Sequence, residues 1–205
     1  MISSVNYNDK IITIQKYIRG YLKRKLILIM PSYYQTKIWR KARKWYKGGK
    51  SNECEKYQIE LIEKMLTTSL MKTHDRIYME TFEIINNTHP MKNADGYEYT
   101  ENFDRMLIKG INKYYFNLKF VCDGGGAQTR SLKEVYHFIR CQMEYLIKFN
   151  TNNTYFINIL DGDTSYHVME QFLYLLNKEQ YKKVKNYVFI GSLYDFQKKR
   201  ALLIV

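Results

Sequence analysis

The 205-residue sequence predicts a mixed α/β (α+β) domain that follows a basic helical extension. Apolar residues recur at helical spacing in some segments and at strand spacing in others. These segments come in the order helix, two or three strands, helix, strand, helix, strand, which permits a mixed sheet with a parallel pair. In addition, residues 1–50 carry a net charge of +12, whereas residues 51–205 carry only +1. We therefore expect two parts, 1–50 and 51–205.

The composition favours a folded protein that stays inside the cell. Hydrophobic residues make up 45% of the chain and aromatic residues 16%, which is enough for a packed core. The three cysteines have no zinc-like spacing, and an odd number argues against a secreted disulfide scaffold. The sequence has neither a leader pattern nor a long apolar run. We expect an intracellular protein, cytoplasmic or nuclear, with no membrane span.

The basic part predicts two helices. Residues 9–29 place apolar side chains at helical spacing and basic side chains between them, which is typical of a cationic amphipathic helix. Pro31 ends this helix, and Ser32 is a candidate N-cap for a second basic helix that reaches Tyr46. The glycine pair 48–49 then indicates a linker.

A short motif lies within the first of these helices. It consists of Ile14-Gln15, Arg19-Gly20 and Arg24. This pattern resembles the IQ motif, and the resemblance implies binding of calmodulin or a related light chain. Apolar anchors would lie in a groove of the partner while the arginines meet its acidic residues. The alternatives are that the helix packs on the rest of this chain or contacts nucleic acid.

The remaining elements follow from periodicity and turn residues. Helical spacing extends from Glu55 to about Asn86, and residues 96–101 alternate as a short strand does. A β-hairpin is expected next, and after a glycine run a helix that includes Gln142. The expected bounds are 103–108 and 113–122 for the hairpin strands, 155–160 for a buried strand, 165–178 for a helix, 187–190 for a strand and 202–205 for a last strand.

Polar residues of the expected hairpin suit the hydrolysis of phosphodiester bonds. This reaction uses hard cations held by oxygen ligands, together with a positive group near the attacking water. Asp104 begins the first strand of the hairpin. The large apolar residues of the second strand have even numbers, so Asn117 and Lys119 share the opposite face. The alternative is that Asp104 is a turn former and Lys119 an exposed edge charge.

This arrangement resembles the PD-(D/E)XK nuclease superfamily, which includes many type II restriction endonucleases. The likeness covers about residues 55–160, where the expected order matches the αβββαβ core of that superfamily. It implies that Asp104 stands for the first Asp, the segment 117–119 for (D/E)XK, and Gln142 for a polar residue of the next helix. The segment Gly125-Gly126-Ala127-Gln128-Thr129-Arg130 also resembles a restriction-endonuclease sequence.

The resemblance implies a Mg²⁺-dependent DNA endonuclease whose catalytic residues are Asp104, Asn117, Lys119 and Gln142. Asn117 departs from the family pattern because an amide replaces the acid there. Its oxygen can bind magnesium but cannot act as a base. The metal ligands would then be Asp104, Asn117 and a carboxylate from elsewhere, for which the candidates are Glu80, Glu83, Glu101 and Asp123. Otherwise the domain binds DNA without cutting it.

The glycine loop gives a candidate contact with DNA. Gln128, Thr129 and Arg130 lie at the expected start of a helix, where free N–H groups and the helix dipole favour phosphate. The alternative is a simple N-cap after a flexible lead-in. A second function class is a non-enzymatic adaptor that binds a calmodulin-like protein through the IQ helix and carries an inactive nuclease-like domain. The oligomeric state stays open, a homodimer included.

Overall fold

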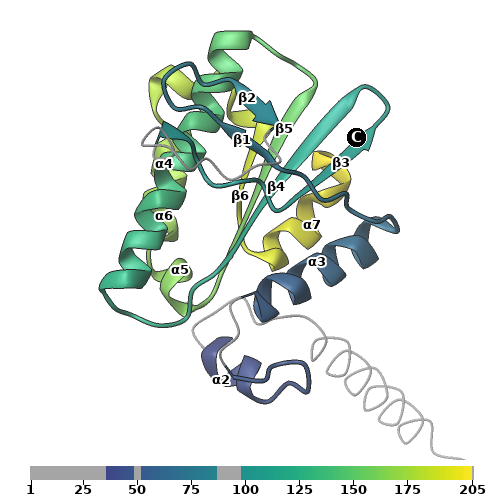
Figure 1. Ribbon diagram of the computed structural model, residues 1–205, viewed down its shortest axis with the longest axis vertical. Coiled ribbons are helices and arrows are strands. Elements are labelled where there is room, and N and C mark those ends of the chain that lie inside the picture. The colour runs from purple at the N-terminus through teal and green to yellow at the C-terminus, as the bar shows by residue number, and fades with distance from the viewer. Residues whose placement is uncertain (1–35, 49–51, 87–97, 205) are drawn as a thin grey trace, which may run out of the picture.

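The computed structural model describes residues 36–48, 52–86 and 98–204, which form a four-stranded mixed sheet between two helical layers (Figure 1). The strand order is β3-β4-β5-β6. β3 and β4 pair antiparallel as a hairpin, while β5 runs parallel to both β4 and β6. The mixed α/β class is thereby confirmed. The strands are β3 (Arg105–Lys109), β4 (Asn112–Phe120), β5 (Thr154–Asp161) and β6 (Val188–Gly191).

The β3–β4 hairpin forms where the sequence predicts it. Gly110 in its turn has a φ of +61°, a left-handed conformation that glycine adopts without a steric penalty. The side chains of β4 alternate between the two faces, so that Tyr115 packs in one core and Tyr114 and Phe116 in the other. The confirmed hairpin places Asp104 just before β3 and Lys119 near the end of β4.

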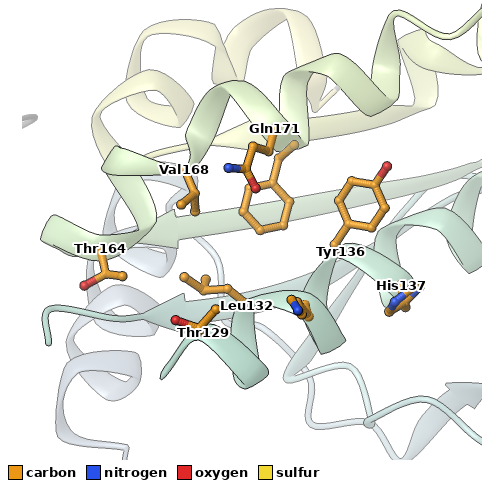
Figure 2. Close-up of a pocket in the computed structure, with 9 residues that line it drawn as sticks. Thr129, Leu132, Tyr136, His137, Thr164, Val168 and Gln171 are labelled. Atoms are coloured by element: carbon orange, nitrogen blue, oxygen red, sulfur yellow. The ribbon is translucent and has the colours of Figure 1, made fainter. Parts of the chain in front are cut away.

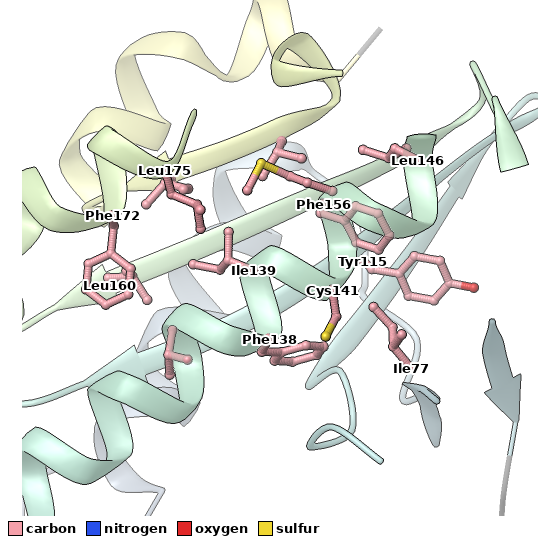
Figure 3. Packing of buried hydrophobic residues seen from close by; sticks show 14 of the residues in the cluster. Ile77, Tyr115, Phe138, Ile139, Cys141, Leu146, Phe156, Leu160, Phe172 and Leu175 are labelled. Atoms are coloured by element: carbon pink, nitrogen blue, oxygen red, sulfur yellow. The ribbon is translucent and has the colours of Figure 1, made fainter. Parts of the chain in front are cut away.

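One face of the sheet is covered by α4 (Gly126–Phe149), α5 (Asp163–His167) and α6 (Met169–Leu176). Figure 3 shows Ile139 of α4 and Leu175 of α6 directed toward the strand that carries Phe156 and Leu160. α4 connects the parallel pair β4 and β5, as a crossover helix should. The expected helix 165–178 is divided, since the backbone at Val168 leaves helical geometry between α5 and α6.

The opposite face is covered by α3 (Glu53–Leu66) and α7 (Leu193–Leu203) (Figure 1). α7 corrects the prediction of a final strand at 202–205, because Leu202 and Leu203 belong to a helix. The helix begins with a capping box between Ser192 and Asp195, which satisfies backbone N–H groups of its first turn. A short apolar run alone does not distinguish a strand from a helix. In this segment the capping box at Ser192 favours the helix.

The prediction of one helix from Glu55 to Asn86 is wrong in its second half. α3 ends at Leu66, where Thr67 adopts a left-handed conformation. The chain then forms a small antiparallel sheet of β1 (Asp75–Ile77) and β2 (Ile84–Asn86). The isoleucines of this segment fit both helical and strand spacing, and the bridge between Tyr78 and Tyr99, together with the packing of Ile77 in the core, selects the strand.

Several other expectations fall at the margins of the described residues. The IQ-like segment Ile14–Arg24 lies outside them. Of the strand expected at 96–101, residues 98–101 are described, and they form no strand but only an isolated bridge between Tyr99 and Tyr78. The second basic helix is represented by α2 (Thr36–Lys41), which is shorter than predicted and does not reach Tyr46. Two single 3₁₀ turns, η2 (Glu179–Tyr181) and η3 (Lys185–Tyr187), precede β6. No helix among the described residues is long and apolar enough to cross a membrane.

α2 contacts the α/β domain even though the sequence assigns it to the basic part. The Thr36 hydroxyl and backbone N–H donate to Asp163, at 2.7 and 2.9 Å. Lys37 and Arg40 both form ion pairs with Asp123, which follows β4. Residues 36–48 therefore pack where the loops after β4 and β5 meet, and their positive charge is partly neutralised there.

Candidate functional site at the edge of strand β4

The hairpin leaves the last residues of β4 unpaired on one side, and Asp104 occupies that edge. The Asp104 N–H donates to the Phe116 carbonyl at 2.9 Å, and the Leu118 N–H donates to Asp104 Oδ2 at 2.7 Å. The carboxylate therefore satisfies a backbone donor where β3 has not yet begun. Burial raises the pKa of Asp104, although the Leu118 bond and the charge of Lys119 oppose this shift.

Lys119 lies beside Asp104 and pairs with a second acid. Its ammonium forms an ion pair with Glu101, and the lysine side chain is only 16% exposed, compared with 45% for Glu101. Burial alone would lower the pKa of Lys119, but Glu101, Asp104 and Glu55 outweigh it, so the pKa is raised. The lysine is therefore a fixed positive charge at neutral pH.

Glu55 completes this group from the first turn of α3, and sequence reasoning missed it. Burial and the neighbouring Asp104 raise its pKa, while Lys119 lowers it. Three residues later on the same helix, Gln58 donates to the Lys119 carbonyl at 3.3 Å. The sequence offers one sign of this role, which is that Glu55 and Gln58 are three residues apart in the helix expected there and therefore lie on one face. We name Glu55, Glu101, Asp104 and Lys119 the edge cluster.

Asn117 and Gln142, which the resemblance to the PD-(D/E)XK superfamily assigns to the catalytic site, lie in the core and not in the edge cluster. The Asn117 amide donates to Asn158 Oδ1 at 3.0 Å, and the Gln142 amide donates to the same oxygen at 3.1 Å. Asn158 in turn donates to Gln142 Oε1 at 2.8 Å and to the Phe189 carbonyl at 3.2 Å. All three amides are buried, and we name them the amide cluster.

One atom of the amide cluster remains unsatisfied. Among the described residues, nothing hydrogen-bonds to Asn117 Oδ1, although this atom is buried. Asn117 and Lys119 share one face of β4, as the alternation predicts, and both lie beyond Phe116, where the pairing with β3 ends. Lys119 pairs with Glu101, whereas Asn117 contacts Asn158 of β5. The structure thus brings Asp104 and Lys119 together and leaves Asn117 among the neighbours of α4.

A buried acid at the end of β5 links this region to the parallel strands. Asp161 is fully buried and accepts from the Gln58 amide at 2.6 Å, the Tyr166 hydroxyl at 3.0 Å and the Leu193 N–H at 3.1 Å. Burial raises the pKa of Asp161 to about 6, against the lowering effect of these donors. Gln58 donates both to Asp161 and to the backbone carbonyl of Lys119. Asp161 therefore helps to hold Gln58, and through it the backbone of Lys119, in position.

The other predicted residues are placed as follows. Glu80 lies in the β1–β2 turn and accepts a hydrogen bond from Tyr78. Thr129 and Arg130 are exposed in the first turns of α4, and no side chain of the described residues caps this helix at Gly125. Gln128 is half-buried beside the same glycine. The start of α4 therefore still presents uncapped N–H groups to an anion.

The chemistry of the edge cluster suits a magnesium ion better than a softer metal. Three carboxylates provide hard oxygen donors, and one ammonium provides positive charge beside them. Within the described parts of the chain, however, no three His, Cys, Asp or Glu side chains already lie close enough to hold an ion. One oxygen of Asp104 is taken by Leu118, and Glu101 is held by Lys119. Binding of a metal would require Glu101 or Glu55 to turn.

Comparison with known proteins gives no relative: no family model, no curated protein sequence and no solved structure matches this chain.

Proposed function

We propose that the protein is a metal-dependent DNA endonuclease of the PD-(D/E)XK kind, with the edge cluster as its active site. The observation that supports this proposal best is that three carboxylates from α3 and the approach to β3 lie around one half-buried lysine of β4. The order of α3, the β3–β4 hairpin, α4 and β5 also supports it, although the described main sheet has two strands before α4 where the αβββαβ core has three, and β1 and β2 form a separate sheet.

In this proposal the residues have distinct roles. Asp104 and Glu55 would hold Mg²⁺, with Glu101 as a further ligand once it leaves Lys119. Bound Mg²⁺ would polarise the phosphoryl group and lower the pKa of a coordinated water. Because the pKa of Lys119 is raised, its ammonium stays protonated. Lys119 then orients the phosphate and stabilises the charge of the transition state, and it is no general base.

The proposal assigns the amide cluster to the fold. Asn117 and Gln142 contact Asn158 in the core, so their role is to fix β4 and β5 against α4. The carboxylate that the family has at position 117 would be replaced functionally by Glu55 or Glu101. Gln128, Thr129 and Arg130 would bind a DNA phosphate through the uncapped start of α4.

A plasmid-cleavage assay tests the proposal. Purified protein is incubated with supercoiled plasmid in Mg²⁺ or in EDTA, and nicked and linear products are measured on a gel. We expect cleavage only with Mg²⁺. Asp104→Asn and Lys119→Met should each lower the rate by about 100-fold or more, as expected on removing a metal ligand or a transition-state charge.

Lys113→Met is the matched control, because Lys113 lies on the same strand and is exposed. Its rate should stay within about threefold of the original, since an exposed charge contributes little. If Asp104→Asn and Lys119→Met both cleave at the original rate, the edge cluster is not the active site. If no variant and no wild-type sample cleaves single-stranded or duplex DNA, the endonuclease proposal is wrong.

The IQ-like motif supports a second proposal, a calmodulin-binding adaptor function. Every position specified by the motif is present in Ile14-Gln15, Arg19-Gly20 and Arg24. An adaptor would use this helix to recruit a calmodulin-like protein and would need no catalysis by the α/β domain. The two functions are compatible because they use different parts of the chain.

Binding to immobilised calmodulin, with Ca²⁺ or with EDTA, tests this second proposal. We expect retention of the full chain and its loss in the double variant Arg19→Ala/Arg24→Ala, which removes the two positive charges of the motif. Lys10→Ala/Lys16→Ala is the control, since it removes the same charge outside the specified positions. Equal retention of both double variants would indicate attraction by charge alone.

A further inference from the structure

A cavity lies on the face of the sheet opposite α3, between α4 and the α5–α6 region. Its volume is about 270 Å³, just below the usual range of about 300–1,000 Å³ for small-molecule sites. In Figure 2, Leu132 and Tyr136 of α4 face Val168 and Gln171 across the opening. The α4 residues of the wall recur three or four positions apart, so one stripe of the helix forms one side of the cavity.

The wall is apolar inside and positively charged at its rim. Leu132 and Phe172 are buried, and Tyr136 and Val168 are partly buried beside them. The rings of Tyr136 and Phe172 lie 6.2 Å apart between centroids, at an angle of 48°. Of the nine described residues that line the cavity, none is acidic. The rim carries Lys133 and adds polar groups from Thr129, Thr164, Gln171 and His137.

We propose that this cavity binds a small aromatic carboxylate. The two aromatic rings and the aliphatic floor would cover a flat apolar ring, which such side chains do favourably. Lys133, exposed at the rim, would pair with the carboxylate, and the hydroxyl and amide groups beside it would donate hydrogen bonds. The volume limits the ligand to one or two rings. The edge cluster takes no part in this binding, and Thr129 at the rim is shared with the proposed phosphate contact at the start of α4.

Isothermal titration with 2-naphthoate and with uncharged 2-naphthamide tests the site in the full chain. We expect 2-naphthoate to bind at least about fivefold more tightly than the amide. Lys133→Gln should weaken the binding of 2-naphthoate by about two- to fivefold, the effect of a solvent-accessible ion pair. Lys64→Gln, on α3 at the opposite face, should leave it unchanged.

A pair of tryptophan variants on α6 tests the location. Gln171→Trp places a large side chain into the cavity from an exposed helix position and should lower affinity at least about tenfold. Leu173→Trp, two positions away and 39% exposed, does not line the cavity and should bind normally. Equal affinity for the amide and the acid, or unchanged binding in Gln171→Trp, would overturn the proposal, as would a failure of 2-naphthoate to bind at millimolar concentration.

Discussion

Asn117 and Lys119 lie two residues apart on the same face of β4, yet they belong to opposite kinds of environment. Asn117 is buried and shares hydrogen bonds with Asn158 and Gln142. Lys119 reaches the open edge of the strand, where it pairs with Glu101 beside Asp104. The strand pattern gives both residues the same face. It does not say which neighbouring elements cover each residue.

The neighbours of each residue decide between these two environments, because both residues lie beyond Phe116, where the pairing of β3 with β4 ends opposite Arg105. Asn117 lies opposite Asn158 of β5, which also contacts Gln142 of α4, and such amides occupy a core without burying a charge. Lys119 lies two residues nearer the end of β4, where it pairs with Glu101 and stays partly exposed. The cover that β5 and α4 give to Asn117 therefore separates the amide cluster from the edge cluster.

Among the variants that test this comparison, Asn117→Asp is expected to lower the free energy of unfolding the most. The change places a carboxylate in the core, where Asn158 presents an acceptor oxygen to it and, among the described residues, nothing donates to Asn117 Oδ1. We expect the free energy of unfolding to fall by about 3–5 kcal/mol, as for an uncompensated buried charge. Urea unfolding at pH 7 measures it.

Asn186→Asp is the control for that measurement, since Asn186 is exposed and its variant should stay within about 0.5 kcal/mol. If Asn117→Asp were as stable as this control, position 117 would be open to solvent or to a cation. The separation between the two clusters would then be wrong.

A smaller change in the free energy of unfolding is expected when the pH changes, because Asp161 titrates. Its pKa in the folded protein is about 6, above the ordinary value of 3.8, so the folded state holds the proton more tightly than the unfolded state. Protonated Asp161 therefore stabilises the fold fully below about pH 4, and this contribution is lost as the pH rises to about 6. The loss in the free energy of unfolding is about 3 kcal/mol.

Urea unfolding at several pH values measures this dependence. Asp161→Asn removes the titrating group and should flatten the loss of stability between about pH 4 and 6. Burial also raises the pKa of Asp104 and Glu55, so a weaker slope of the same sign should remain. An unchanged slope in Asp161→Asn would show that this carboxyl is not the buried group responsible.

The smallest effect on stability is expected for Lys119→Met. The ion pair with Glu101 is partly exposed, and the methionine retains most of the apolar stem. We expect a change in the free energy of unfolding within about 1 kcal/mol, as is usual for such pairs. A loss similar to that of Asn117→Asp in urea unfolding would mean that Lys119 is structural, and the contrast between the clusters would disappear.

The sequence predicts the central part of the fold because strand alternation and turn residues agree there. Gly110 marks the hairpin turn, and the even-numbered apolar residues of β4 define its face. The class of the domain and the shared face of Asn117 and Lys119 follow from this pattern. The segment 75–86 was not predictable in the same way, because its isoleucines fit either period and long-range pairing selected the strand.

The sequence predicts only part of the candidate site, because the remaining residues are brought there by contacts between distant segments. Asp104 and Lys119 are close along a hairpin, so local pairing predicts their approach. Glu55 approaches them through the packing of α3 against the sheet, and no periodicity encodes which helix turn meets which strand end. Asn158 likewise gave no signal, since a polar residue in a buried strand is explained only by its partners Asn117 and Gln142.

The central claim is that the residues of the edge cluster catalyse DNA cleavage, whereas those of the amide cluster stabilise the fold. Rates of Mg²⁺-dependent plasmid cleavage by Lys119→Met and Gln142→Met test it most directly, because both variants receive the same side chain. We predict that Lys119→Met loses about 100-fold or more in rate. Gln142→Met should stay within about threefold at a temperature where circular dichroism shows both to be folded. A folded Gln142→Met without activity, beside a fully active Lys119→Met, would contradict the account.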